Sequence, residues 1–160
     1  MAHRDGCLPL GRGALLRVSG QPIEFVRWVW STQDVGHLNI CTGDPKHQTF
    51  WEFLTVALTL TVWGCKFRRQ KVTILCDNSA ALQAALDLKG RGDMLTIARE
   101  VAWRQAREKW LFQVAHLPNE QNTSADALSR MSMPRPASLP DELTGARELA
   151  APLVSEFWKL

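Results

Sequence analysis

Two apolar-rich segments separated by a short polar turn near the start of the chain predict a β-hairpin. Residues 13–18 (GALLRV) and 21–30 (QPIEFVRWVW) have the composition of strands, and Ser19-Gly20 between them suits a tight turn, because glycine tolerates positive φ. Residues 31–46 are rich in Ser, Gly, Asp, Asn and Pro, which predicts a connection.

Helical periodicity follows from residue 47 to residue 63. The apolar residues Phe50, Leu54, Ala57, Leu58 and Val62 recur at helical spacing, which predicts a largely buried helix. Many β-branched residues lower its intrinsic propensity, so packing must hold it.

Strands and helices then alternate. The continuously apolar segment 71–77 (KVTILCD) predicts a central strand covered on both faces, and 110–117 (WLFQVAHL) predicts a second buried strand. Helical patterns cover 79–88 and about 93–109 between them. Residues 122–130 predict a short helix capped by Asn122 or Thr123.

This order of elements predicts an α/β fold with an antiparallel edge, because strands joined through helices pair in parallel. We assign residues 1–130 to one domain and residues 131–160 to a proline-containing tail. Within the tail, residues 131–140 should form no regular element. Residues 141–160 are expected either to form a short docking helix or to stay mobile.

Composition fits one domain with a proper core: 160 residues, 18.0 kDa and 46% hydrophobic residues. No apolar run reaches the ~18 to 20 residues of a membrane span, and the first residues lack the order of a secretory signal. We therefore expect an intracellular protein, in the cytoplasm or the nucleus. The four cysteines are scattered and are expected to be reduced, mostly buried thiols.

Charge is unevenly placed along the chain. The segment from Lys66 to Trp110 contains ten basic and five acidic residues, a net charge of +5. The remainder contains nine basic and eleven acidic residues, a net charge of −2. A basic segment is typical of a protein with a polyanionic partner such as nucleic acid. A solvated helix surface would explain the same charges.

Three carboxylates occupy positions at which chemistry is common. Asp77 ends a strand, where ligands bind in α/β sheets, although it is also placed to cap the next helix, as are Asn78 and Ser79. Glu52 lies within the apolar helix and is costly to bury unpaired, unless it turns to the polar side. Asp126 lies in the first turn of the last helix, where it also fits a capping box.

This fold could bring the three acids together. Converging carboxylates repel one another unless divalent cations neutralise them, and oxygen ligands select hard ions, Mg²⁺ or Mn²⁺. Two such ions ~3.5 to 4 Å apart would activate a water and stabilise the leaving oxygen of a phosphodiester.

From about residue 5 to residue 130, the chain resembles the ribonuclease H domain of gypsy/DIRS-like, LTR-type retroelement reverse transcriptases. The resemblance rests on four ordered segments: GALL with SGQPIEF, HQTFWEFLTVALTL, VTILCDNSAAL and AHLPNEQNTSADALSR. The last matches the family's characteristic closing run through His116, Pro118, Asn122, Asp126, Leu128, Ser129 and Arg130.

The resemblance implies a mixed five-stranded sheet with helices on both faces, and an endonuclease that cleaves the RNA strand of RNA–DNA hybrids with two Mg²⁺ or Mn²⁺ ions. It implies that Glu52, Asp77 and Asp126 are catalytic metal ligands. Asp5 is the candidate for the family's first ligand. Only four residues precede Asp5, so we expect the first strand to be truncated.

The expected partners are an RNA–DNA hybrid and a polymerase domain on a parent polyprotein. We expect Arg68, Arg69, Asn78 and Asn122 to contact nucleic acid, since a hybrid is read through its shape and phosphates. The alternatives are a catalytically inactive, retroelement-derived nucleic-acid-binding or structural module and, third, another nuclease or strand transferase of the same fold.

Overall fold

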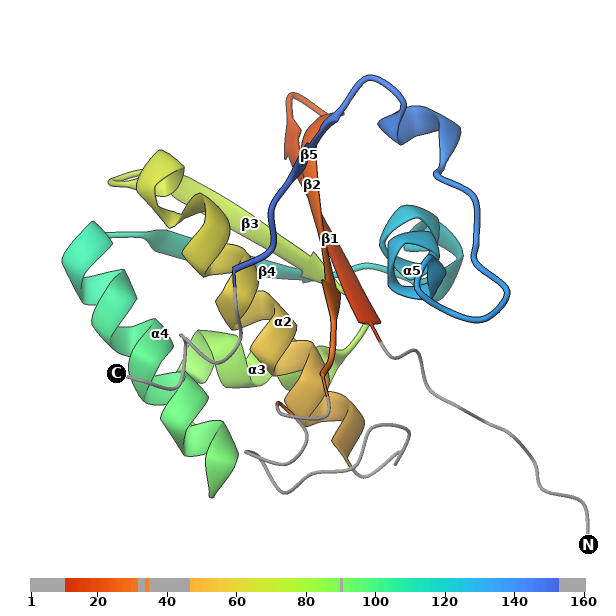
Figure 1. Cartoon of the computed structure of the whole chain (residues 1–160). Helices are drawn as coiled ribbons and strands as arrows, with labels where there is room; N and C mark the ends of the chain where they lie inside the picture. Colours follow the sequence, from red (N-terminus) through yellow and green to blue (C-terminus); the bar gives the residue numbers. More distant parts are fainter. Residues whose placement is uncertain (1–10, 32–33, 35–46, 90, 153–160) are drawn as a thin grey trace, which may run out of the picture. The chain divides into compact units, whose positions relative to one another are not determined.

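The computed structural model describes residues 11–31, 34, 47–89 and 91–152, whose strands and helices form an α/β protein (Figure 1). The chain divides into two compact units. Unit 1 contains residues 1–48 and 123–151, and unit 2 contains residues 49–122 and 152–160. Each unit is described by itself.

The predicted hairpin is confirmed in unit 1. Strand β1 (Gly11–Val18) pairs antiparallel with β2 (Gln21–Val29), and the register shifts between Leu16 and Arg17. Ser19 and Gly20 form the turn with φ of 51° and 81°, as a two-residue hairpin of right-handed twist requires.

Helix α5 (Thr123–Arg130) packs on β1, and a third strand, β5 (Arg147–Leu149), pairs in parallel with β2. The short helix η4 (Asp141–Leu143) supplies Leu143, which is fully buried with Phe25 and Leu128. Sequence analysis placed a domain boundary at residue 130, but packing groups residues 131–151 with unit 1, because Leu143 and β5 complete its core and sheet. Residues 131–140 form no helix or strand, as predicted.

Unit 2 contains the predicted order of helices and strands. Helix α2 (Gln48–Trp63) is followed by η2 (Gly64–Phe67), β3 (Lys71–Cys76), α3 (Ser79–Asp87), α4 (Asp93–Glu108) and β4 (Leu111–His116). Strands β3 and β4 are parallel, and Lys71 to Cys76 pair in order with Leu111 to His116. Ten residues of α2 are buried, which agrees with the prediction that packing holds this helix.

The two parallel strands are not buried on both faces, contrary to prediction. Alternate residues of β3 are exposed, and Leu75 and Leu111 keep 51% and 63% of their surface. The apolar run predicted a central strand, but β3 and β4 form a sheet of two strands with α3 packed against it. The continuous apolar sequence of β3 therefore does not correspond to a strand that is covered on both faces of its sheet.

The expected five-stranded sheet is not present in the described ranges, where the strands form a three-stranded sheet, β1-β2-β5, and a two-stranded sheet, β3-β4. Asp5 and the truncated first strand lie outside the described residues. Among the helices that the structure describes, none is long and apolar enough to cross a membrane.

We predict that Gly13→Ala destabilises unit 1, because an added Cβ would lie 2.2 Å from Leu128 Cβ on α5. Overpacking of this kind costs about 1 to 3 kcal/mol in the free energy of unfolding, measurable by urea denaturation. Gly145→Ala is the control: its Cβ would meet no atom within 4 Å, and we expect a change below about 0.5 kcal/mol. Equal effects of the two substitutions would contradict the observed packing of β1 on α5.

Candidate metal centre at the end of β3

Asp77 directly follows β3, at the carboxyl end of the parallel pair. Its neighbour Asn78 is the N-cap of α3, since Asn78 Oδ1 accepts a hydrogen bond of 2.9 Å from the backbone N–H of Ala81. The capping alternative for Asp77 is therefore ruled out, and the carboxylate of Asp77 is available for other contacts.

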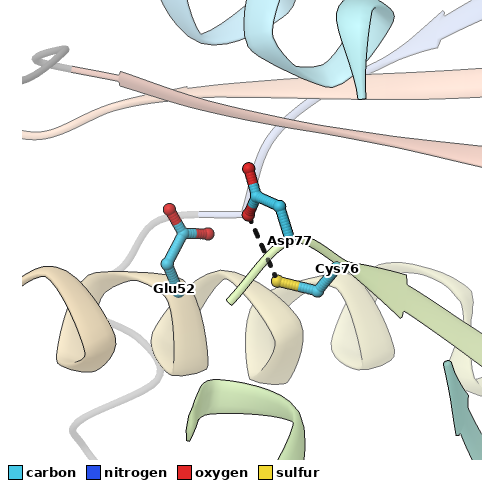
Figure 2. A group of neighbouring side chains, drawn as sticks. All are labelled: Glu52, Cys76 and Asp77. Atoms are coloured by element: carbon cyan, nitrogen blue, oxygen red, sulfur yellow. Dashed lines mark hydrogen bonds between the residues drawn. The ribbon is translucent and has the colours of Figure 1, made fainter. Parts of the chain in front are cut away.

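Glu52 comes from α2 and lies beside Asp77 (Figure 2). Ligand atoms of Glu52, Cys76 and Asp77 all lie within 4.8 Å of one another, and all three residues are half-buried. The Glu52 carboxylate is therefore close to that of Asp77. Two of the predicted metal ligands converge within unit 2.

Both carboxylate oxygens of Asp77 have partners. Asn122 Nδ2 donates to Oδ2 at 3.0 Å, and Cys76 Sγ donates to Oδ1 at 3.8 Å. Asn122 and Asn78, both predicted to contact nucleic acid, therefore position Asp77 and α3 respectively. The side-chain amide fixes one oxygen and leaves lone pairs on both for a cation.

Cys76 was predicted as a buried core thiol, and the structure places it in the acidic cluster instead. The pKa of this thiol is raised from 9.0 to about 12, chiefly by burial; the N–H of Asn78 opposes the shift, and the nearby charges of Glu52 and Asp77 add to it. Cys76 is thus a neutral thiol at physiological pH. The only sequence signal for this role was its position next to Asp77.

Asp126 belongs to unit 1, on α5. Its carboxylate forms an ion pair of 3.0 Å with Arg130, four residues along the same helix, and both side chains are more than half exposed. Asp5, the fourth predicted ligand, lies outside the described residues.

Arg68 and Arg69 lie before the start of β3, at the opposite end of the strand from Asp77. Six residues of strand separate the two ends, or about 20 Å at ~3.3 Å per residue. These arginines and the asparagines near Asp77 therefore belong to different surfaces of unit 2.

Comparisons with models of known protein families, with curated proteins and with solved structures found no match.

The donor set of the cluster fits a hard divalent cation. Glu52 and Asp77 offer carboxylate oxygens, which Mg²⁺, Mn²⁺ and Ca²⁺ prefer at ~2.0 to 2.6 Å. Cys76 is protonated, so it adds no negative ligand, and Asp77 keeps its orientation through Asn122. Small rotations of the carboxylates would close a span of 4.8 Å around one ion.

We predict that Cys76 resists alkylation by iodoacetamide, whereas exposed Cys65 reacts readily. Only the thiolate reacts, and with a pKa of about 12 its fraction at pH 8 is roughly 10³-fold lower than with a pKa of 9.0. The rate at Cys76 should rise about tenfold per pH unit in the folded protein. Tryptic peptides 47–66 and 72–89 separate the two cysteines for mass spectrometry, and equal labelling of both at pH 8 would contradict the geometry.

Proposed function

We propose that the protein is a metal-dependent nuclease of the ribonuclease H type that cleaves the RNA strand of RNA–DNA hybrids, within a retroelement reverse transcriptase. The observation that carries the proposal is the convergence of Glu52 and Asp77, which lie in different elements. The resemblance of the motifs around them supports the same assignment, including a ribonuclease H-like fold.

In this proposal Glu52 and Asp77 would hold Mg²⁺, which would supply Lewis acidity for hydrolysis of a phosphodiester. Asn122 restricts the motion of Asp77 through a bond of 3.0 Å, so only a small rotation of the carboxylate would be needed to bind a cation. The resemblance implies Asp126 as a further ligand; on α5 of unit 1 its carboxylate pairs with Arg130.

A second candidate is a nucleic-acid-binding module without catalysis. The observation that favours it is the ion pair of Asp126 with Arg130, which occupies the carboxylate that the nuclease requires. Hybrid binding without Mg²⁺-dependent cleavage would identify this function.

We expect the purified protein to cleave a labelled RNA–DNA hybrid in Mg²⁺ and to lose at least ~10²-fold in rate in Asp77→Asn and in Glu52→Gln, because each substitution removes a charged ligand. Asp87→Asn, an exposed acid at the end of α3, is the matched control and should keep the rate. Denaturing electrophoresis of the labelled RNA measures the products. Cleavage by Asp77→Asn at the wild-type rate would refute the assignment.

Cation binding can be measured apart from catalysis. We expect Mn²⁺ to bind the wild-type protein in calorimetry and to raise its Tm, since a ligand that binds only the folded state stabilises it. Asp77→Asn should abolish both effects and Asp87→Asn should preserve them. Binding without cleavage would favour the second candidate, and no difference between the two variants would exclude a cation at this cluster.

A further inference from the structure

Exposed cations gather at the amino end of the β3-β4 pair. The turn after α2 and the end of α4 meet there, because the N–H of Arg69 donates to Glu108 O at 3.2 Å and the N–H of Leu111 donates to Gln70 O at 3.1 Å. These two segments, residues 64–71 and 103–111, contain a single acid, Glu108. The exposed cations of this amino-end surface are Lys66, Arg68, Arg69, Lys71, Arg107 and Lys109.

Glu108 holds two of these cations side by side. Glu108 Oε2 accepts from Arg68 Nε at 2.9 Å, and Oε1 accepts from Arg107 Nε at 2.7 Å. The Glu108 side chain is only 8% exposed, whereas those of Arg68 and Arg107 are 65% and 49% exposed. A buried carboxylate therefore orients two guanidinium groups that remain open to solvent.

The contacts of both arginines within the described residues use Nε, and they leave the terminal nitrogens of each guanidinium for another acceptor. Arg107 is held a second time, because its guanidinium carbon lies 4.4 Å from the ring centre of Trp103, which is itself 53% exposed. Paired, restrained guanidinium groups match the oxygens of a phosphate and lose little entropy on binding. Free surface lysines would not have this preorganisation.

We propose that this amino-end surface binds the phosphate backbone of a nucleic acid, with Arg68 and Arg107 as a preoriented phosphate clamp. It is separate from the candidate metal centre, since about 20 Å of β3 lies between Lys71 and Asp77. The proposal goes beyond cleavage and holds whether or not Glu52 and Asp77 support catalysis. The surface would hold a further stretch of the same strand or duplex, or a second one.

The most discriminating test is Glu108→Gln, because two explanations predict opposite changes in the affinity for nucleic acid. If attraction to the surface is only general electrostatics, removal of one negative charge strengthens binding. If Glu108 orients the clamp, the substitution weakens binding of a short hybrid by about threefold or more, since a neutral amide holds the guanidinium groups less firmly. Fluorescence anisotropy in EDTA measures the affinity apart from the cation site, and circular dichroism with the Tm verifies the fold.

A second pair of variants tests the location without disturbing Glu108. Arg69→Ala/Lys109→Ala removes two exposed cations of the amino-end surface. The control, Arg91→Ala/Arg99→Ala, removes one exposed cation that precedes α4 and one that lies within it. We expect at least a ~10-fold loss of affinity near 0.1 M salt, and a shallower log–log salt slope by about 1 to 2, for the first pair only.

Hybrid and single-stranded RNA probes, each tested with every variant, show which form the surface prefers. Equal losses from the two double variants, or binding by Glu108→Gln that equals or exceeds wild type with an unchanged Tm, would overturn the proposal. A loss confined to Arg69→Ala/Lys109→Ala and to Glu108→Gln would establish it. Loss of cleavage in Asp77→Asn without loss of hybrid binding would separate this surface from the proposed nuclease centre.

Discussion

The parallel pairing of β3 with β4 determines how the chemistry of unit 2 is distributed. Parallel strands cannot be joined by a tight turn, so α3 and α4 carry the chain back to the start of the second strand. As a result both amino ends lie together and both carboxyl ends lie together. Trp110 anchors the amino end: its Nε1 donates to Gly64 O at 3.0 Å, and a Cβ on Gly64 would lie 2.4 Å from its ring.

At the carboxyl end, the chemistry follows from the balance between repulsion and hydrogen bonding. Glu52 and Asp77 are brought together although their charges repel, and the neutral thiol of Cys76 lies close to both. Asn122 offsets part of this cost through its bond to Asp77. A hard cation that neutralised both acids would stabilise such a cluster further, which is the physical reason for proposing a cation there.

The amino end shows the reverse arrangement, in which one buried acid organises cations. Glu108 has a lowered pKa because Arg68 and then Arg107 donate hydrogen bonds to it, so it stays ionised and keeps both guanidinium groups in place. In the proposed function the two ends of the β3-β4 pair would have different roles. The oxygen ligands at the carboxyl end would act on one phosphate, and the paired arginines at the amino end would hold another part of the nucleic acid. Because the length of β3 separates the two ends, they would not compete for the same phosphate.

The sequence by itself determined the helices, the strands and their order, because hydrophobic periodicity and turn residues act over a few neighbouring positions. The hairpin at Ser19-Gly20 and the α/β class follow from such local signals. The motifs also marked Glu52 and Asp77 as candidate ligands, together with Asp126 and Asp5, and the structure brings the first two together. Only the tertiary structure decided that Asn78 caps α3 and that one face of the β3-β4 sheet is exposed. It also decided that residues 131–151 join unit 1 and that Glu108 binds two arginines. Each of these outcomes depends on contacts between distant segments, or on competition between neighbouring side chains for one hydrogen bond, and local patterns carry no information on either.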